Sequence, residues 1–384
     1  MTTLHSSAKT IGELLAKQIE QDPHFYLFSP DETTSNKLDA VYDVSTRAWN
    51  SAKEKWDLPE KANGRIVELL SENTLFGVMS GHILSGEQAM MASYESFFSV
   101  ITSQILQHIK FLEQSAPVKW RPDYPAINLL STSTCWRQDH NGFTHQSPAL
   151  ISTLLSLPSN KTNCLFPIDD NASKVAFKFM LKSKNVVNLT TFNKTEEPRW
   201  LTVEQAAEQL KNSGASIIEA VSDRAPEFVF AGAGDIASRE AIYAMQILKN
   251  DIPSLKMRFV NIAALSYNAI GTTENQLTKA EFNKLFTNNK LILANFHGYA
   301  DTLQHILAQY TDPKRIRVHG FSDQGTTTTP FEMLSLNEAS RYHLAIDVAK
   351  QLRRQDLARK YQKIIDDNHE HAKEFGLDSD IVLQ

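Results

Sequence analysis

The apolar segment Ile127-Asn128-Leu129-Leu130 precedes the polar run Trp136-Arg137-Gln138-Asp139-His140-Asn141-Gly142-Phe143-Thr144-His145-Gln146-Ser147-Pro148, and the apolar segment Ala149-Leu150-Ile151 follows it. The polar run crowds two imidazoles, a carboxylate, a guanidinium and several amides around one glycine. A loop this polar between buried elements is costly unless its groups are paired or used. The sequence therefore predicts buried elements on both sides of a loop that carries chemistry.

The same alternation of apolar strands and amphipathic helices extends along the chain. A first helix has Ile11, Leu14, Leu15 and Ile19 on one face and ends near Asp22, and a long helix is expected from Tyr94 to Leu112. Strands are predicted at residues 24–28, 65–70, 126–130, 163–166, 185–189, 228–231, 257–262, 291–295 and 316–318. Alternation of this kind indicates parallel sheets covered on both faces.

The segment Pro198-Arg199-Trp200 and the polar helix after it indicate a boundary between two units. We therefore expect an α/β protein with two consecutive domains, residues 1–200 and 201–384, each with a mainly parallel sheet. Two helices are expected to close the chain, with Asn337 as an N-cap.

The composition excludes several classes of protein. The chain has 384 residues, 42% of them apolar, and a net charge of −5, which does not favour nucleic acid or an anionic membrane as a partner. No apolar run reaches the roughly 20 residues that span a bilayer. The two cysteines, Cys135 and Cys164, form no disulfide framework, and Met1-Thr2-Thr3-Leu4-His5 does not resemble a secretion signal. The cytoplasm is the expected location.

Three motifs have competing explanations. Gly232-x-Gly234 follows a strand, as in dinucleotide-binding proteins, but Ala237 replaces the third glycine. The run Gly325-Thr326-Thr327-Thr328-Thr329-Pro330-Phe331 is either a phosphate-binding loop or a structural turn. His140 and His145 could bind a metal together, but no third ligand stands at a familiar spacing. We therefore expect no metal bound by the residues of this chain. A purely structural role for their loop stays open.

At this point the residues resemble the phosphoketolase family of thiamine-diphosphate enzymes, which is related to transketolase. The run from Trp136 to Gln146 carries the resemblance most clearly. Further segments follow in the family's order, namely residues 28–36 (Phe-Ser-Pro-Asp-Glu-Thr-Thr-Ser-Asn), 70–72 (Leu-Ser-Glu), 93–97 (Ser-Tyr-Glu-Ser-Phe), 297–299 (His-Gly-Tyr) and 325–331. The resemblance implies a pyrimidine-binding middle domain followed by a transketolase-type C-terminal domain.

The family's diphosphate-binding motif, Gly-Asp-Gly followed by Asn-Asn, is absent from the sequence. The resemblance therefore implies that thiamine diphosphate and its Mg²⁺ are held largely by another chain or a missing domain. It implies a homodimer, a hetero-oligomer with such a chain, or both. The implied reaction cleaves a ketose phosphate with inorganic phosphate and yields acetyl phosphate and an aldose phosphate, as an aldehyde-lyase does.

The resemblance also assigns roles to residues. Glu72 matches the glutamate that hydrogen-bonds the pyrimidine ring, and burial should raise the pKa of such a carboxyl. Tyr94 matches the aromatic residue that packs on that ring, and Glu32 belongs to the same cofactor site. His140 and His145 are candidate proton donors. The residues expected to bind or orient substrate and phosphate are Ser35, Lys37, Gln138, Asn141 and Lys194.

The sequence departs from the family around these residues. Lys37 replaces an arginine, which keeps the charge but loses the bidentate fork. The segment Asn73-Thr74-Leu75-Phe76-Gly77-Val78-Met79-Ser80-Gly81-His82 differs from the family pattern, and Glu87 reverses a charge. Asn193-Lys194-Thr195-Glu196 has also changed. These departures leave four readings: a split phosphoketolase subunit active with a partner, a split transketolase-like enzyme, a non-catalytic structural or regulatory relative, or a truncated gene product.

Overall fold

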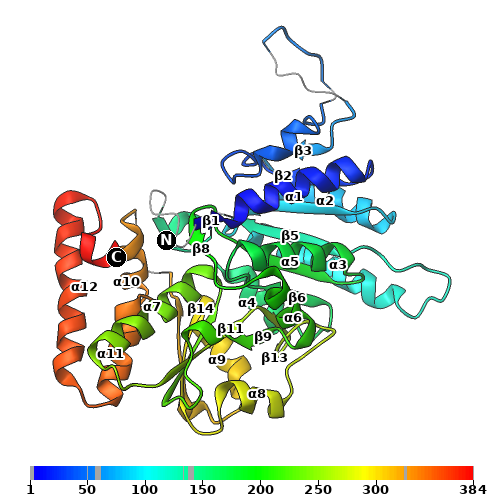
Figure 1. Cartoon of the computed structure of the whole chain (residues 1–384). Helices are drawn as coiled ribbons and strands as arrows, with labels where there is room; N and C mark the ends of the chain where they lie inside the picture. The colour runs from blue at the N-terminus through cyan, green and yellow to red at the C-terminus, as the bar shows by residue number, and fades with distance from the viewer. Residues whose placement is uncertain are drawn as a thin grey trace.

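The computed structural model describes residues 4–49, 51–56, 62–132, 134–136, 142–323 and 327–383. Within them, two large sheets are each enclosed by helices (Figure 1). This arrangement confirms the predicted α/β fold with mainly parallel sheets.

The first sheet has eight strands in the order β13-β12-β6-β7-β5-β4-β2-β3. Its six parallel strands are β2 (Tyr26–Ser29), β3 (Ile66–Glu68), β4 (Ala89–Tyr94), β5 (Ile127–Thr132), β6 (Thr162–Leu165) and β7 (Val187–Thr191). Two antiparallel strands, β12 (Ala264–Ser266) and β13 (Ala269–Ile270), extend it beyond β6. The first sheet therefore contains strands from both sides of the domain boundary predicted at residue 200. That boundary stays a prediction.

Helices cover both faces of the first sheet. Helices α1 (Ser7–Gln21) and α5 (Asp170–Lys182) pack on one face, where Met90 and Leu130 are buried. Helices α2 (Glu72–Leu84), α3 (Thr102–Ser115) and α4 (Ala149–Ser156) pack on the other. Three aligned asparagines cross the sheet: Asn163 donates to Asn188 (2.9 Å), which donates to Asn128 (2.8 Å). This polar ladder fixes the register of three central strands.

The second sheet has the order β15-β14-β10-β11-β9. Strands β10 (Phe228–Ala233), β11 (Met257–Ile262), β14 (Leu291–Tyr299) and β15 (Ile316–Phe321) are parallel, and β9 (Ala215–Ile217) is antiparallel. Its helices are α6 (Val203–Asn212), α7 (Asp235–Asp251), α8 (Lys279–Phe286), α9 (Ala300–Ala308), α10 (Pro330–Leu336), α11 (Arg341–Gln351), α12 (Gln355–Phe375) and α13 (Asp380–Leu383). One apolar cluster includes Leu129 and Val187 of the first sheet and Val260 and Ile292 of the second, so the two halves share a core.

Most predicted strands are confirmed, but two expectations are wrong. Tyr94 ends strand β4 and does not begin a helix, which starts only at Thr102. The strand Ala89-Met90-Met91-Ala92-Ser93-Tyr94 has no β-branched residue, so its sequence looks helical. Asn337 follows the end of α10, where its side chain donates to the Met333 carbonyl, and Ser340 is the N-cap of α11.

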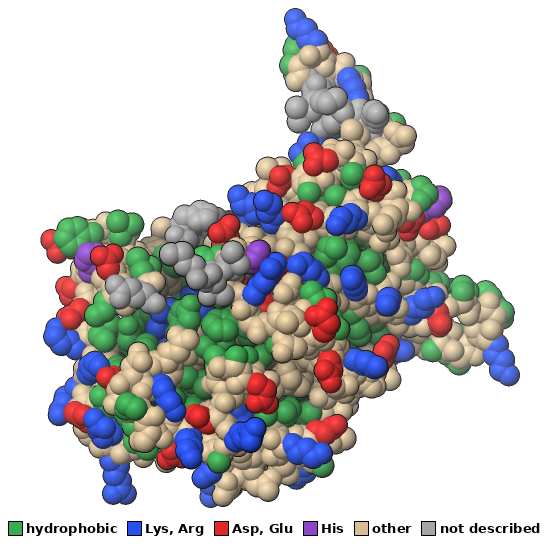
Figure 2. Space-filling view, in the orientation of Figure 1, with side chains coloured by type: hydrophobic (Ala, Val, Ile, Leu, Met, Phe, Trp, Pro, Cys, Tyr) green, Lys and Arg blue, Asp and Glu red, His purple; other side chains and the backbone are tan. Residues whose placement is uncertain are grey.

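The surface agrees with the charge balance of the sequence. Figure 2 shows basic and acidic side chains intermixed on the face that it presents, without a large area of one sign. No helix among the described residues is long and apolar enough to cross a membrane. A short antiparallel pair, β1 (Leu4–Ser6) with β8 (Glu196–Pro198), ties the start of the described chain to the segment between the two halves.

Candidate active site

The predicted site residues come from the carboxyl ends of adjacent parallel strands. Tyr94 ends β4, Lys194 lies three residues after β7, and the segment with Glu32 and Ser35 follows β2. Glu72 begins helix α2, shortly after β3. In open α/β sheets, ligands bind in the crevice outside the carboxyl ends of the strands. The fold therefore brings together residues that are far apart in the sequence.

Tyr94 is the centre of this group. Its ring stacks on Phe97 with a centroid separation of 5.8 Å, and the His145 ring meets it edge-on at 6.3 Å. The Lys194 ammonium lies 5.2 Å from the centroid of the Tyr94 ring, at cation–π distance. Two residues predicted to act with Tyr94, His145 and Lys194, are thus in contact with its ring. Phe97 is a fourth member that the sequence reasoning did not select.

Glu72 lies beside the same strand end. Ser71 caps helix α2 by accepting from the Thr74 amide, which places the Glu72 carboxylate in the first helical turn. Ser93, the neighbour of Tyr94, donates to Glu72 Oε1 at 3.2 Å. The Glu72 side chain is half-buried. The burial expected for it would therefore need a bound molecule or another chain over this edge of the first sheet.

The loop after β2 contributes both signs of charge. Ser35 donates to Glu32 Oε2 at 2.6 Å. Burial lowers the pKa of the Lys194 ammonium, and the charge of Lys37 lowers it further, while the charge of Glu32 opposes both. Lys194, Lys37 and Glu32 are therefore close enough to interact. Lys37 itself has a backbone φ of 62°, a turn conformation that is uncommon for a lysine.

Carboxylates crowd the other side of this loop. Burial raises the pKa of Asp31, and the charges of Glu32, Glu68 and Glu72 raise it further. The Glu68 carboxylate is engaged by Arg47 and by the Tyr42 hydroxyl. Lys37 and Lys194 place positive charge beside the same loop, so groups of both signs border the Glu72 edge. Three of the predicted residues, Gln138, His140 and Asn141, lie outside the described residues.

A second cluster, buried behind Tyr94, was not selected from the sequence. Glu95 follows Tyr94 directly, and its Oε1 lies 2.8 Å from His297 Nε2, while its Oε2 accepts from the Cys135 amide at 2.9 Å. Glu95 and His297 are separated by 202 residues. Both occur in segments that resemble the family, but no spacing in the sequence indicates that they touch.

Glu95, Cys135 and His297 each offer one potential metal ligand, and these atoms lie within 4.8 Å of one another. The arrangement is already closed by hydrogen bonds, because the carboxylate of Glu95 is engaged by both neighbours. Burial, with the Glu95 charge adding to it, raises the pKa of the Cys135 thiol well above its usual range. We therefore interpret the cluster as a contact between the two halves.

The loop that carries His145 is anchored at both described ends. The Trp136 amide donates to Gln146 Oε1 at 2.7 Å. The Trp136 ring is fully buried, packs edge-on against His297 at 5.7 Å, and meets the Phe321 ring in a tilted arrangement at 6.2 Å. The polar loop therefore begins with an aromatic side chain that packs against residues of the C-terminal half. Neither the polarity nor the length of the loop indicates this contact.

The glycines at the end of β10 have a packing function. A Cβ atom on Gly232 would lie 2.4 Å from Ser238 Oγ, and one on Gly234 would lie 2.5 Å from His297 Cβ. Gly234 also has a φ of +102°, which L side chains rarely adopt. The space that a dinucleotide would need at this strand end is filled by the protein itself, so the glycines let two elements approach closely.

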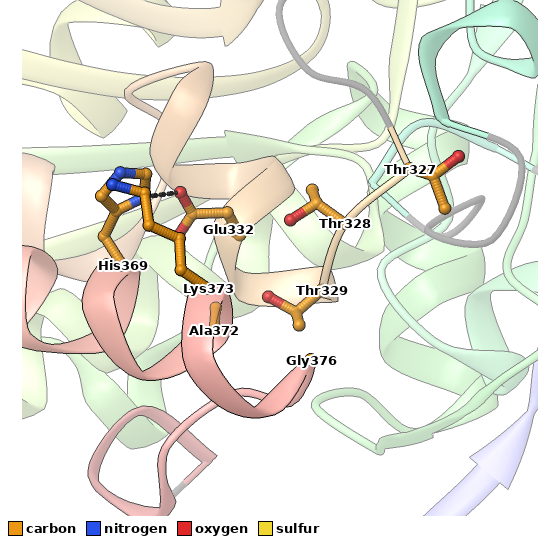
Figure 3. Close-up of a pocket in the computed structure, with 8 residues that line it drawn as sticks. All are labelled: Thr327, Thr328, Thr329, Glu332, His369, Ala372, Lys373 and Gly376. Atoms are coloured by element: carbon orange, nitrogen blue, oxygen red, sulfur yellow. Dashed lines mark hydrogen bonds and ion pairs between the residues drawn. The ribbon is translucent and has the colours of Figure 1, made fainter.

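The threonine-rich run borders a separate cavity of about 510 Å³, shown in Figure 3. Its lining residues are Thr327, Thr328, Thr329, Glu332, His369, Ala372, Lys373 and Gly376. Glu332 is buried and paired with His369, Thr329 donates to Asp378, and Lys373 donates to Glu370 at 3.1 Å. Carboxylates thus engage the cationic groups and a threonine hydroxyl, which favours the structural-turn explanation over phosphate binding.

Comparisons with known proteins agree with this geometry. The model of the D-xylulose 5-phosphate/D-fructose 6-phosphate phosphoketolase family matches residues 9–183, and the model of the C-terminal domain of that family matches residues 194–383. A probable phosphoketolase of Pseudomonas putida is 35% identical over 86% of this chain and 42% of its own length. One from Thermosynechococcus vestitus is 35% identical over 97% of this chain and 47% of its own. The chain thus spans less than half of these relatives.

Solved structures of transketolases share the fold. Transketolase from Pichia stipitis, in complex with sedoheptulose 7-phosphate, superposes with a TM-score of 0.68 at 15% identity, over 91% of this chain and 47% of that one. A split-gene transketolase, described as an inactive β4 tetramer, has a TM-score of 0.59 at 13% identity, over 90% of this chain and 97% of that one. At these identities the likeness concerns the fold alone.

Proposed function

The chain belongs to the phosphoketolase family, and on this premise we propose that it is one subunit of a split phosphoketolase-like enzyme. The enzyme cleaves a ketose phosphate with inorganic phosphate, giving acetyl phosphate and an aldose phosphate. A second chain supplies the half that binds the diphosphate and Mg²⁺ of thiamine diphosphate. The observation that supports this proposal best is the contact of Tyr94 with His145 and Lys194 next to Glu72.

The residues at this strand end fit the pyrimidine half of the cofactor. Glu72 offers a carboxyl group that binds a ring nitrogen, and Tyr94 offers an aromatic side wall. When bound, thiamine diphosphate supplies the carbon–carbon bond cleavage, and the protein orients and tunes it. The diphosphate is proposed to lie on the partner chain, because this sequence lacks the family's Gly-Asp-Gly motif.

The remaining residues act on the substrate. Lys194 and Lys37 attract the phosphate group, and Ser35 supplies a hydroxyl next to them. His145, which touches Tyr94, holds or delivers a proton at the reacting end. Gln138, Asn141 and His140 are proposed to orient and protonate the substrate from the same loop. The enzyme is proposed to work in the cytoplasm, in a homodimer joined to its partner chain.

The split arrangement has a structural parallel. The split-gene transketolase chain that this chain matches over 97% of its length is described as an inactive β4 tetramer. By analogy, the present chain is proposed to assemble without its partner and to lack turnover in that state. The same observation favours a second candidate, a non-catalytic subunit of a larger assembly. A split enzyme that transfers two carbons to another acceptor, as transketolase does, is the third.

The test combines purification with one substitution. The chain is isolated from its native cells, and the co-purifying proteins are identified by mass spectrometry. We expect a stoichiometric partner that carries Gly-Asp-Gly and the downstream asparagines, and acetyl phosphate release from xylulose 5-phosphate or fructose 6-phosphate by the complex. Glu72→Gln should reduce kcat roughly a hundredfold or more. Glu208→Gln, an exposed carboxylate on α6, is the matched control.

The outcomes separate the three candidates. A complex that contains the partner and keeps its full activity after the Glu72→Gln substitution would contradict the catalytic assignment. Sugar transfer to an aldose acceptor without acetyl phosphate would favour the transketolase-like enzyme. A homo-oligomer without a diphosphate-binding partner would leave the non-catalytic candidate.

A further inference from the structure

A closed circuit of contacts lies directly behind the Tyr94 ring. Glu95 accepts from the Cys135 amide, and the next amide, Trp136, donates to Gln146 (2.9 and 2.7 Å). His145, the neighbour of Gln146, touches Tyr94, the neighbour of Glu95. We name these six residues, Tyr94, Glu95, Cys135, Trp136, His145 and Gln146, the contact circuit. Every member touches the next through a hydrogen bond, a ring contact or a peptide bond.

The contact circuit is held from the C-terminal half by Phe321, which packs against Trp136, and by His297. His297, on β14, contacts Glu95 Oε1 at 2.8 Å and packs against the Trp136 ring. The side chains of His297 and Glu95 are 1% and 4% exposed, so water does not compete for this bond. Behind His297, Gly234 approaches so closely that no Cβ would fit. The Gly234 backbone therefore limits the space on one side of the His297 side chain.

Glu95 transmits the position of His297 to the site. One of its oxygens is bound to His297 and the other to the Cys135 amide, so a rotation of the carboxylate breaks one bond or the other. Cys135 and Trp136 begin the loop whose far end carries His145. We propose that His297 is a positioning residue, which sets the geometry of Tyr94 and His145 through Glu95 and so gives the C-terminal half a part in the site.

Charge reinforces the contact. Burial by itself lowers the pKa of His297, but the charge of Glu95, the hydrogen bond to it and the charge of Asp235 outweigh burial, so the pKa is raised above 6.5. The groups that face the imidazole are thus Glu95 and Asp235, together with the neutral Cys135 thiol and the Trp136 ring. The importance of this positioning for catalysis rests on the proposed function, whereas the positioning itself does not.

Hydrogen–deuterium exchange measures the positioning without any need for turnover. The amides of Cys135 and Trp136 are protected by the side chains of Glu95 and Gln146, so their exchange reports on the contact circuit. We expect His297→Asn, which is too short to reach Glu95, to speed exchange at residues 135–136 and 142–147 roughly tenfold or more. His297→Gln retains a donor of suitable length and should restore most of the protection.

The matched control is His319→Asn. His319 also pairs with a carboxylate, Asp347, at 3.1 Å, but it lies within the C-terminal half and outside the contact circuit. It should leave exchange at residues 135–136 unchanged. Equal exchange in His297→Asn and the parent chain, or equal loss in both Asn variants, would overturn the proposal. If His297→Asn does not fold, His297→Leu, which fills a similar volume but offers no donor to Glu95, provides the same measurement.

An activity measurement tests the last step separately. In the assembled complex, His297→Asn should lower kcat with little change in KM, because it touches no substrate group. An inactive parent complex would contradict the proposed function but not the positioning, since the exchange data stand alone. Normal kcat together with fast exchange would overturn the catalytic importance of the contact.

Discussion

The carboxyl ends of the two parallel sheets occupy equivalent places in their halves, yet they differ in what fills them. The end of β4 opens onto half-buried polar groups, with Glu72, Lys194 and His145 around Tyr94. The end of β10 is closed by Ser238 and His297, which pack against glycines. One strand end leaves its polar groups half-buried, and the other is filled by contacts that connect it to the first half of the chain.

This difference shows how a fold can assign separate tasks to similar positions. Strand ends are the usual place for ligands in α/β proteins, and Gly232-x-Gly234 imitates a nucleotide motif. The second strand end instead provides the rigid support for the first through His297 and Glu95.

Gly234→Ala should have the largest effect. Its Cβ would lie 2.5 Å from His297 Cβ at a φ of +102°, so both the steric contact and the backbone oppose it. We expect a loss of about 3 kcal/mol or more in the free energy of unfolding. Gly81→Ala is the control, because nothing lies within 4 Å of its Cβ position and a helical alanine stabilises by up to about 1 kcal/mol. Urea unfolding of both variants should give opposite signs, and equal values would contradict the closed strand end.

Asn188→Leu should have the next largest effect, in the core of the first sheet. It removes the middle of the asparagine ladder and leaves Asn163 and Asn128 without their partners. We expect a loss of about 2–4 kcal/mol. The double variant Asn128→Leu/Asn188→Leu should lose less free energy of unfolding than the sum of the single variants. It also removes the Asn128 acceptor that Asn188→Leu leaves unpaired. Additive losses in urea unfolding would show that the ladder is not coupled.

The fold was largely predictable from the sequence because apolar periodicity carries most of its information. The four parallel strands of the second half were predicted, since they are largely buried and contain branched apolar residues, whereas the short antiparallel strands β9, β12 and β13 were not. Strand β4 was missed, because its methionines, alanines and aromatic residue are equally suited to a helix. Asn337 was misplaced by three residues from the true cap, because both Asn337 and Ser340 have capping side chains.

The candidate site was predictable only as a set of residues. Tyr94, His145 and Lys194 were named, and the structure places them together, but Phe97 was not named. The contact between Glu95 and His297 spans 202 residues, and no local pattern encodes such a distance. The role of Trp136 as an anchor also depends on a pocket made by the other half, which exists only after the chain has folded.

The pH dependence of stability should sharpen the contrast further. The raised pKa of His297 means that the folded state favours the protonated imidazole. This stabilisation is present below about pH 6.5 and is lost as the pH rises through the raised folded-state pKa. His108 and His343, whose pKa values burial lowers to about 4, stay neutral in this range. The difference in free energy of unfolding between the parent chain and His297→Gln should therefore shrink as the pH rises from 6 to 9, by at most about 1.4 kcal/mol per pH unit. Urea unfolding at each pH measures this difference. A constant gap would contradict a charged contact.

The smallest effect concerns the open strand end. Burial and the charge of Lys37 lower the pKa of Lys194, and the charge of Glu32 opposes them. Glu32→Gln should therefore lower this pKa further, and Lys37→Met should raise it. The pH midpoint of acetylation at Lys194, followed by mass spectrometry, measures both shifts against the exposed Lys17. We expect Lys194 to titrate below Lys17 and to move in opposite directions in the two variants. If both variants shift the pH midpoint of Lys194 in the same direction, Glu32 and Lys37 do not act on Lys194 through charge. The end of β4 would then be less polar than its contacts indicate.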